Sequence, residues 1–473
     1  MTEELLINVG PFQTRIARIE NGRLAEIWVE PEGGESRVGN IYLGRVARVL
    51  PSIGGAFVEL GLERHGFLPL NERTPGADPL EEGASVIVQV RKDAHAEKGV
   101  RLTRRLGLPG RYVVFCPRLD AVLCSRQIAD ETEREELCRL VGAMLADGEG
   151  AILRSLAPRA SRAQMEVDLA SLREVWRKIQ SRRAGSSASA CLHREVEATL
   201  RAIRDNCGAD VSRVLIDSRE VHLRAQRYCA QWAPSLVERL VHYDEGQPLF
   251  ELYDINGALE EALRPQVALP SGGRLIIQAT EALTAIDVDS GGFVHARDAE
   301  QTSLQTNLLA VREITRQLRL RNIAGLVVID FITLDDSGHR SQVVAALRES
   351  LARHRLPSTV GEMSALGLVE VTRKRARPSL GESLTEPCLV CLGTGRVQRI
   401  EAVASALLQA VRNEARAGAR AVTVAASPEV ASWLEARGIG DDQGVGVAGC
   451  RVELQSRADF EREHFDILPL QVR

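Results

Sequence analysis

The feature that most constrains this fold is a strand–helix–strand pattern between residues 280 and 332. The stretch TEALTAIDVDSGGF, residues 280–293, begins with an apolar run typical of a strand and continues into glycine. A helix is predicted for TSLQTNLLAVREITRQLRLRN, residues 302–322, and a second strand for GLVVID, residues 325–330. Strand, helix and strand in this order predict a βαβ unit with parallel neighbouring strands. The chain therefore contains an α/β domain.

Both predicted strands end in carboxylates. Asp287 and Asp289 are two residues apart, so a strand places them on one side, and Asp330 ends the second strand. The carboxyl ends of parallel strands open into a common crevice, where carboxylates, water and a substrate phosphate are typical ligands of Mg²⁺. Such an ion activates water and offsets charge on a phosphodiester. The alternative is that each aspartate caps the turn or helix that follows it.

Basic residues near this unit favour the functional interpretation. Arg312, Arg316 and Arg319 lie on one face of the predicted helix, and VTRKRARPS, residues 371–379, adds four cations. Such a charge run is usually a solvated surface. Opposite a carboxylate site, however, it predicts contacts with a phosphate backbone.

Length and composition indicate a multidomain globular protein. At 473 residues, 44% of them hydrophobic, the chain is too long for one core. The acidic start lacks the features of a signal peptide, and no apolar run approaches the ~20 residues that span a bilayer, so we expect a cytoplasmic protein without a membrane segment. Nine scattered cysteines indicate reduced thiols. The net charge of −4 still allows basic surfaces, since residues 91–126 carry nine Lys/Arg against three Asp/Glu.

Residues 40–72 and 83–93 predict a small barrel, because short alternating runs are divided there by proline and glycine. Phe57 and Phe67 lie near basic residues, as an OB-fold nucleic-acid platform requires. The alternative is that both phenylalanines belong to the core. Residues ~106–200 then predict an inserted α+β module with helices at 130–145 and 161–183. A loop at 184–190, a helix at 191–206 and a strand at 211–218 follow.

Cys388 and Cys391 supply two thiolates at C-x-x-C spacing, whereas a closed structural zinc site has four ligands. No other cysteine has a partner at metal-ligand spacing. Three interpretations stay open from the residues alone: two chains each give a pair to one zinc ion, the motif is redox-active, or it binds nothing. The pair lies in a joint at residues 385–398, before a small α/β segment.

These motifs together resemble the ribonuclease E/G family of bacterial endoribonucleases over nearly the whole chain. The matching stretches include NIYLGRV, AFVELGLERHGFLPL, TEALTAIDVDSG, RPSLGES and CLVCLGTGRV, in the order and spacing of the family. The resemblance implies an α/β multidomain fold with a DNase I-like catalytic domain, an RNase H-like subdomain, an inserted OB-fold barrel and an α+β 5′-sensor. The implied boundaries are 1–36 and 210–262 for the RNase H-like subdomain, 37–105 for the barrel, 106–209 for the sensor, 263–384 for the catalytic domain, 385–398 for a zinc-link and 399–473 for a small C-terminal domain.

The resemblance also implies roles for single residues. Asp287 and Asp330 match the magnesium-binding aspartates, while Cys388 and Cys391 match a zinc site shared between chains. The RNA-binding residues are expected to be Phe57, Phe67, Lys98 and Arg373. The 5′-phosphate is expected at Arg154 and Ser155, where the family usually has threonine at the second position.

One departure concerns the catalytic motif, because Asp289, a candidate catalytic residue together with Asp287 and Asp330, replaces a family asparagine. A further negative charge beside an anionic substrate is expected to repel it unless the metal compensates. We therefore expect a Mg²⁺-dependent endoribonuclease that cleaves single-stranded RNA to 5′-phosphate and 3′-hydroxyl products in RNA processing and decay. The alternative is a catalytically impaired RNA-binding paralogue. We also expect a compact, ribonuclease G-like branch without a degradosome scaffold tail, forming a homodimer or homotetramer through the shared zinc.

Overall fold

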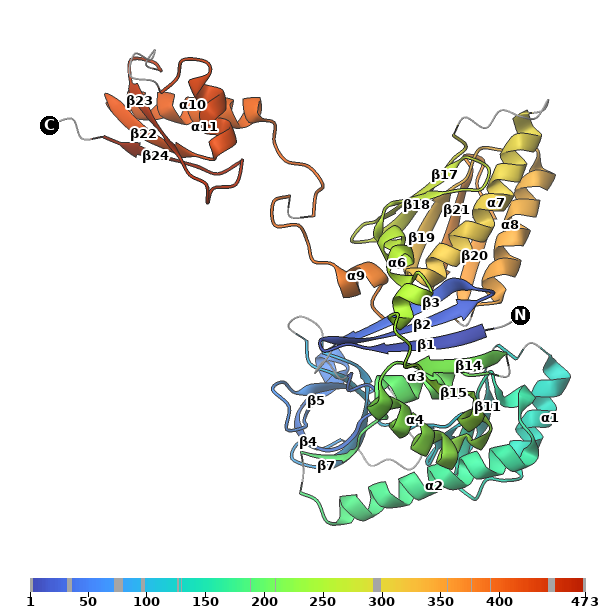
Figure 1. Ribbon diagram of the computed structural model, residues 1–473. Helices are drawn as coiled ribbons and strands as arrows, with labels where there is room; N and C mark the ends of the chain where they lie inside the picture. The colour runs from blue at the N-terminus through green and yellow to red at the C-terminus, as the bar shows by residue number, and fades with distance from the viewer. Residues whose placement is uncertain are drawn as a thin grey trace. The chain divides into compact units, whose positions relative to one another are not determined.

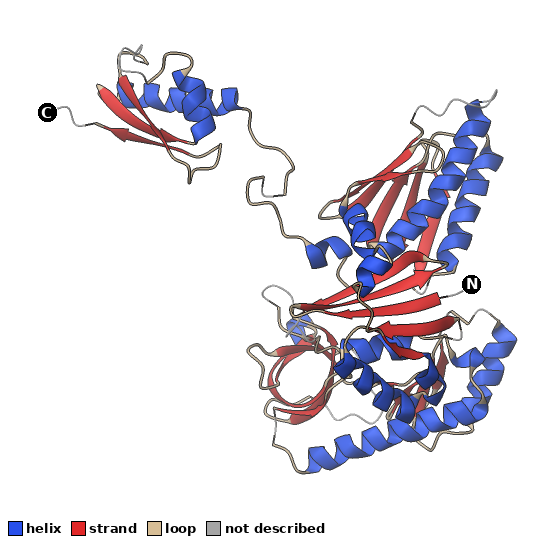
Figure 2. Cartoon of the chain, in the orientation of Figure 1, coloured by secondary structure: helices blue, strands red, loops and turns tan. Residues whose placement is uncertain are grey.

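The computed structural model divides the chain into two compact units, Met1–Leu384 and Thr385–Arg473 (Figure 1). It describes residues 3–31, 36–71, 80–94, 98–125, 127–128, 130–187, 189–208, 210–291, 299–354, 356–375, 377–391, 393–440 and 447–470. In the first unit these residues form a five-stranded, a four-stranded and two six-stranded sheets. Figure 2 shows helices covering these sheets. Among the described helices, none has the length and apolar character needed to cross a bilayer.

The five-stranded sheet joins the amino terminus to residues beyond position 210. Its strands, in spatial order, are β15 (Leu240–His242), β14 (Val211–Ile216), β1 (Glu3–Val9), β2 (Gln13–Glu20) and β3 (Arg23–Pro31). β1 is parallel to β14 and antiparallel to β2. On one face, α3 (Ala198–Asn206) and α4 (Arg219–Trp232) bury apolar residues against the sheet. The short helices α5 (Leu249–Leu252) and α6 (Ile255–Leu263) contribute to a second core on the same sheet.

One six-stranded sheet closes into a five-stranded barrel. Its strands run in the order β4 (Ile41–Leu50), β5 (Gly55–Glu59), β6 (Gly66–Pro69), β8 (Arg101–Thr103) and β7 (Ser85–Lys92), and β7 pairs back with β4. The sixth strand, β13 (Ala190–His193), pairs with the start of β4. The prediction of a helix over 191–206 is therefore wrong at its beginning, because pairing with β4 holds residues 190–193 extended. The closed barrel agrees with the expected OB-like architecture.

The four-stranded sheet belongs to the inserted module. Its order is β11 (Val122–Cys124), β12 (Gly150–Leu153), β10 (Val113–Cys116) and β9 (Leu108–Pro109). α1 (Glu131–Gly142) and α2 (Arg162–Ala184) share its core. α2 begins with a capping box in which Ser161 and Gln164 satisfy each other's backbone N–H groups, so the predicted helix start is confirmed.

The second six-stranded sheet contains the predicted βαβ unit. Its order is β16 (Gln266–Ala268), β17 (Arg274–Ala279), β18 (Leu283–Asp289), β19 (Gly325–Asp330), β21 (Leu368–Arg373) and β20 (Ser358–Met363). β18 and β19 are parallel and are joined through α7 (Ala299–Leu320), which confirms that prediction. α7 and α8 (Ser337–Ala352) cover one face of the sheet (Figure 1). α9 (Leu380–Leu384) ends the first unit.

The second unit is a three-stranded sheet with two helices. Its elements are α10 (Ile400–Arg416), β22 (Ala421–Ala426), α11 (Pro428–Glu435), β23 (Arg451–Ser456) and β24 (Phe465–Pro469). The central strand, β22, is parallel to β23 and antiparallel to β24. The chain is thus a mixed α/β multidomain protein with an OB-like barrel. The finer expectation of DNase I-like and RNase H-like parts stays a prediction.

Candidate active site and RNA-binding surfaces

The two aspartates at the ends of the βαβ strands are direct neighbours. Asp287 on β18 pairs in register with Asp330 on β19. Buried and exposed residues alternate along β18, with Ile286 and Val288 facing the helices and Asp287 on the open face. Adjacent strands lie ~4.8 Å apart, so residues in register on one face bring their carboxylates together. The expected convergence of these two strand ends is confirmed.

The electrostatics of this pair favour a cation. Burial raises the pKa of Asp287, and the negative charges of Asp330 and Asp289 raise it further, while Arg274 acts in the opposite direction. Two repelling carboxylates at one point, open to solvent, match the one or two carboxylates with which proteins usually hold Mg²⁺. The described residues contain no cluster of three or more His, Cys, Asp or Glu side chains able to hold a metal. The two-carboxylate arrangement therefore fits an ion that keeps water and substrate oxygens as its other ligands.

Asp289 lies on the same face of β18 but is engaged by neighbouring groups. Its Oδ2 accepts hydrogen bonds from Arg274, at 2.9 Å from Nε and 2.8 Å from a terminal guanidinium nitrogen. Its Oδ1 accepts the backbone N–H of Gly291 at 2.9 Å. These contacts lower the pKa of Asp289, with the Gly291 N–H as the largest cause. Arg274, which no sequence motif marks, thus offsets the additional charge.

A buried asparagine fixes the chain just beyond Asp330. Asn307 on α7 is fully buried. Its side-chain amide donates to the carbonyl of Ile332 at 2.8 Å, and its Oδ1 accepts the N–H of Ile332 at 3.0 Å. The Phe331 N–H also donates to the carbonyl of Gly367 at 3.1 Å. These bonds hold the carboxyl end of β19, and therefore the position of Asp330. No short sequence motif points to this role of Asn307.

The basic face of α7 lies away from the aspartates, contrary to expectation. α7 packs on the face of the sheet opposite Asp287, because the apolar residues of β18 point toward it. Arg316 pairs with Glu313 of its own helix at 2.7 Å. Arg319 pairs with Glu20 of β2 at 2.5 Å and so ties two sheets together. Arg312 is exposed.

The RNA-binding assignment of Arg373 is also wrong as a direct contact. Alternation along β21 turns this side chain inward, where it is 4% exposed. One terminal nitrogen donates to the carbonyls of Leu318 and Ile323, the latter at 2.7 Å. Burial lowers the pKa of this guanidinium to about 10. Arg373 therefore fixes the end of α7 to β21.

The barrel displays an aromatic pair on its outer surface. Phe57 and Phe67 are cross-strand neighbours with ring centroids 6.0 Å apart and an interplanar angle of 69°. The alternating residues of these strands form the barrel core, whereas both phenylalanines are only half-buried. Gly55 makes room for one ring, since a Cβ there would lie 2.2 Å from Cε2 of Phe67. The interpretation of both rings as core is therefore wrong.

Two arginines lie beside this aromatic pair, one on each side. Arg48 on β4 is the cross-strand neighbour of Phe57, and Arg101 on β8 is the neighbour of Phe67. Both arginines are exposed, as is Lys98, which precedes Val100. The carbonyl of Val100 accepts the Phe67 N–H at 2.8 Å. We call Arg48, Phe57, Phe67 and Arg101 the aromatic row. A pair of rings flanked by cations is the arrangement that single-stranded nucleic acid uses.

The proposed sensor residues follow β12. Arg154 is paired with Asp205 at 2.8 Å, and it also donates to the carbonyl of Gly110. Its side chain is 22% exposed, and Ser155 is exposed beside it. Arg154 and Arg204 lower the pKa of Asp205, although burial opposes them. A phosphate at Arg154 would therefore compete with an existing ion pair.

Cys388 and Cys391 form a short turn in the second unit. Cys388 is exposed, and the N–H groups of Cys391 and Val390 lower the pKa of its thiol. Thr394 fixes the turn, since its N–H donates to the carbonyl of Cys391 at 2.8 Å. Within the described residues no third possible metal ligand lies beside this pair, which thus offers two of the four ligands that a closed structural zinc site needs.

Comparison with known proteins finds relatives that match almost the whole chain. The profile of the family described as "Ribonuclease E/G family" matches residues 107–376. Ribonuclease G of Escherichia coli (strain K12) is 36% identical over 487 residues, covering 99% of this chain and 100% of that protein. Ribonuclease G of Haemophilus influenzae is 35% identical over 486 residues, covering 98% of this chain and 99% of that protein. Ribonuclease E of E. coli (strain K12) is 36% identical over 430 residues, covering 87% of this chain and 40% of that protein.

The fold and these similarities define an endoribonuclease, a hydrolase that acts on RNA. The chain belongs to the ribonuclease E/G family.

Proposed function

We propose that this endoribonuclease cleaves single-stranded RNA hydrolytically at Asp287 and Asp330, leaving 5′-phosphate and 3′-hydroxyl ends. The observation that carries the proposal is the in-register carboxylate pair on the open face of the sheet. Burial raises the pKa of Asp287 and the charge of Asp330 raises it further, and a bound divalent cation would relieve the repulsion between the two carboxylates. Mg²⁺ held by these two residues would activate water and offset charge on the phosphodiester.

Other residues of the chain position the RNA and the aspartates. The aromatic row offers rings for bases and guanidinium groups for phosphates. Asn307 holds the chain beyond Asp330, and Arg274 offsets the charge of Asp289. Arg154 and Ser155 are proposed to bind a 5′-monophosphate, with the guanidinium leaving Asp205 for the ligand. These roles are consistent with an enzyme of RNA processing and decay.

A cleavage assay tests the proposal. A 5′-monophosphorylated single-stranded oligonucleotide is incubated with the protein with and without Mg²⁺, and the ends of the products are identified. We expect Asp287→Asn and Asp330→Asn to lower the rate by about 10²-fold or more, while RNA affinity stays within a few-fold, because the phosphate contacts lie elsewhere. Full activity in either variant would remove the aspartates from the mechanism.

The competing proposal is an RNA-binding paralogue impaired by Asp289. The ion pair with Arg274 argues against it, because the additional charge is compensated within the protein. Turnover in the same assay separates the two, since both proposals include RNA binding.

We further propose that Cys388 and Cys391 bind zinc jointly with the same pair of a second chain, giving a homodimer or a homotetramer. The exposed turn and the lowered pKa of the Cys388 thiol support this proposal. Replacing both cysteines by serine is expected to lower the zinc content and to yield smaller species in size-exclusion chromatography with light scattering. Unmutated protein free of zinc would contradict it.

A further inference from the structure

A cavity of 830 Å³ lies in the first unit, away from the aspartate pair. Its wall includes Trp28 of β3 and Arg37, which precedes the barrel. It also includes Asn322, just before β19, and Arg377, just after β21. Asn322 precedes β19, whereas Asp330 ends that strand, so the cavity is near the opposite end from the candidate active site. We call it the Trp28 cavity. Nothing in the proposed cleavage uses it.

The most informative feature of the Trp28 cavity is the guanidinium of Arg377. Its Cζ lies 5.3 Å from the centroid of the Trp28 ring. It makes no hydrogen bond or ion pair with another side chain among the described residues. Burial lowers the pKa of Arg377, and the more distant charges of Glu30, Asp205 and Glu26 offset this effect only in part. Arg377 is half-buried and has no carboxylate of the described residues in direct contact, and a phosphate can accept two parallel hydrogen bonds from such a guanidinium.

Backbone contacts hold Arg377 in place. The side-chain amide of Asn322 donates to the carbonyls of Arg377 at 3.2 Å and Pro378 at 2.7 Å. The N–H of Leu380 donates to the carbonyl of Arg321 at 2.9 Å. The segment that carries Arg377 is therefore positioned before any ligand arrives, which reduces the entropy lost on binding.

The acidic residues of the wall already have donors. Glu30 pairs with Arg201 at 3.5 Å. Glu382 accepts the N–H of Ser379 at 2.6 Å and pairs with an arginine outside the cavity. Asp93 accepts the backbone N–H of Arg37 and the hydroxyl of Ser36, each at 2.7 Å. These carboxylates therefore leave the guanidinium of Arg377 available to an anion.

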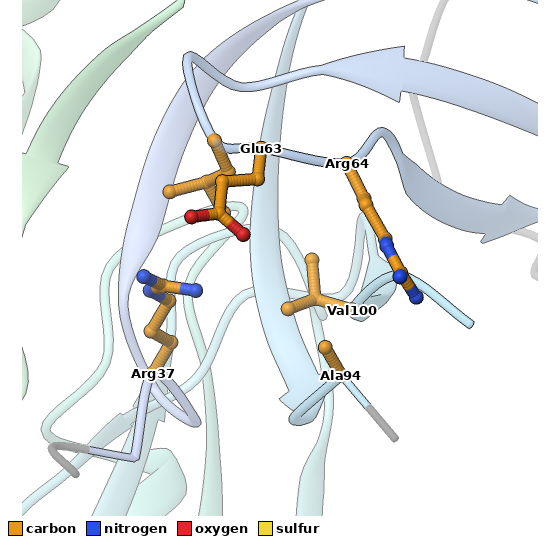
Figure 3. A pocket seen from close by; sticks show the side chains of 7 residues that line it. Arg37, Glu63, Arg64, Ala94 and Val100 are labelled. Atoms are coloured by element: carbon orange, nitrogen blue, oxygen red, sulfur yellow. The ribbon is translucent and has the colours of Figure 1, made fainter. Parts of the chain in front are cut away.

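Arg37 provides a second guanidinium. It borders both the Trp28 cavity and a neighbouring hollow of 270 Å³ on the barrel. Figure 3 shows its side chain in that hollow, directed toward Glu63. No ion pair joins Arg37 to Glu63 or to another described residue. A change of rotamer can therefore direct this charge to either space.

We propose that the Trp28 cavity binds one nucleotide, with its base against the indole of Trp28 and its phosphate at Arg377 and Arg37. The volume lies within the ~300–1,000 Å³ of sites for ligands of this size. An aromatic ring and arginines are the groups that recognise a base and a phosphate without reading sequence. The nucleotide is either free or an unpaired unit of RNA, and only the second source rests on the proposed function.

Fluorescence titration in buffer without added Mg²⁺ tests this inference independently of cleavage. Adenosine 5′-monophosphate and a 5′-hydroxyl single-stranded 10-mer RNA are each titrated into the full chain. The signal of Trp28 is the difference between the unmutated protein and Trp28→Phe. We expect the ligand to quench the tryptophan fluorescence of the unmutated protein but not that of Trp28→Phe. If the RNA competes with the mononucleotide, the source is RNA. Independent binding identifies a free nucleotide.

Charge variants locate the phosphate. We expect Arg377→Ala and Arg37→Ala to weaken binding of the mononucleotide about tenfold or more, which corresponds to ~1.4 kcal/mol. Lys374→Ala is the matched control, because Lys374 is exposed and lies outside the cavity wall. This change removes one positive charge three positions from Arg377. We expect the affinity of this variant for the mononucleotide to stay within twofold of that of the unmutated protein. An unquenched Trp28 with both probes, or equal affinities for all three variants, overturns the inference. Cleavage would remain intact in that case, so the proposed function is tested separately.

Discussion

Arg274 and Asp289 are cross-strand neighbours whose side chains form an ion pair at 2.8 Å on the open face of the sheet that carries Asp287 and Asp330. The pair lies two residues along the strand beyond the in-register aspartates, on the same face. This chain thus places a further carboxylate near Asp287 and supplies the cation that compensates it. Because both side chains are partly exposed, solvent screens their attraction, and we expect the pair to matter more for the local charge than for stability.

The first prediction is that Arg274→Ala lowers cleavage about tenfold, more than Asp289→Asn does. Removing Arg274 leaves the charge of Asp289 beside the substrate phosphate, whereas Asp289→Asn removes that charge together with the need for its partner. Cleavage rates over a Mg²⁺ titration provide the measurement. The double variant should behave like Asp289→Asn, because the two residues act on each other. Additive losses in the double variant would show that Arg274 acts independently of Asp289.

The second prediction concerns the aromatic row. Phe57→Ala or Phe67→Ala is expected to weaken RNA binding by ~1–3 kcal/mol, because each removes a surface on which a base stacks. Arg48→Ala is also expected to weaken RNA binding. The remaining affinity should depend less on salt concentration, because one phosphate contact is lost. Affinity is measured at several salt concentrations without Mg²⁺. Glu59→Ala, an exposed change on the same strand, serves as the control. Unchanged affinity in both phenylalanine variants would exclude the row from RNA binding.

The third prediction follows from the ion pair of Arg154 with Asp205. Arg154→Ala is expected to erase any preference for 5′-monophosphorylated over 5′-hydroxyl substrates, because the charge-assisted contact to the terminal phosphate is lost. Asp205→Asn should retain the preference, since it frees the guanidinium from its competitor. The ratio of kcat/KM for the two substrates is the readout. A preference that survives in Arg154→Ala would place the phosphate elsewhere.

The fourth prediction concerns stability at acidic pH. Burial, followed by the charges of Arg373 and Arg319, lowers the pKa of His354 to about 4, although Glu26 and Glu20 oppose this shift. The unfolded chain takes up a proton near pH 6.5 and the folded protein does so only near pH 4. The free energy of unfolding therefore falls as pH decreases from about 6.5 to 4. The buried Nδ1 of His354 has no hydrogen-bond partner in the described structure, so a phenylalanine can replace this ring.

We expect the Tm of His354→Phe to fall less than that of the unmutated protein between pH 7.5 and pH 5. His65→Phe is the control, because His65 is exposed. Equal losses of Tm in the unmutated protein and in His354→Phe would mean that this residue does not contribute to acid sensitivity.

The βαβ unit and its aspartates were predictable because their signals are local. The apolar runs around Ile286 and Ile329 identify the strands, and the parallel connection brings Asp287 beside Asp330. The barrel was predictable from its alternating short strands for the same reason. The sequence does not decide whether Phe57 and Phe67 point outward, because alternation alone does not say which face of a strand is covered.

The errors concern contacts between distant parts of the chain. Residues 191–193 begin the predicted helix over 191–206 but belong to β13, because β4 offers a free edge some 150 residues earlier. Arg373 belongs to a basic run yet points inward, since alternation on β21 places every second side chain in the core. The role of Arg274 depends on the hairpin register between β17 and β18, which no short motif encodes.

The parallel pairing of β1 with β14 has a consequence for biosynthesis. The partner of β1 at Val211–Ile216 is made roughly 200 residues after β1 itself, which takes about 10–40 s at ~5–20 residues per second. During that interval one edge of β1 lacks its final neighbour, while most strands of the barrel are already complete. We expect arrested nascent chains that expose residues up to 180 to protect the barrel but not β1 from protease. Protection of β1 at that length would show that the hairpin with β2 and β3 is stable by itself.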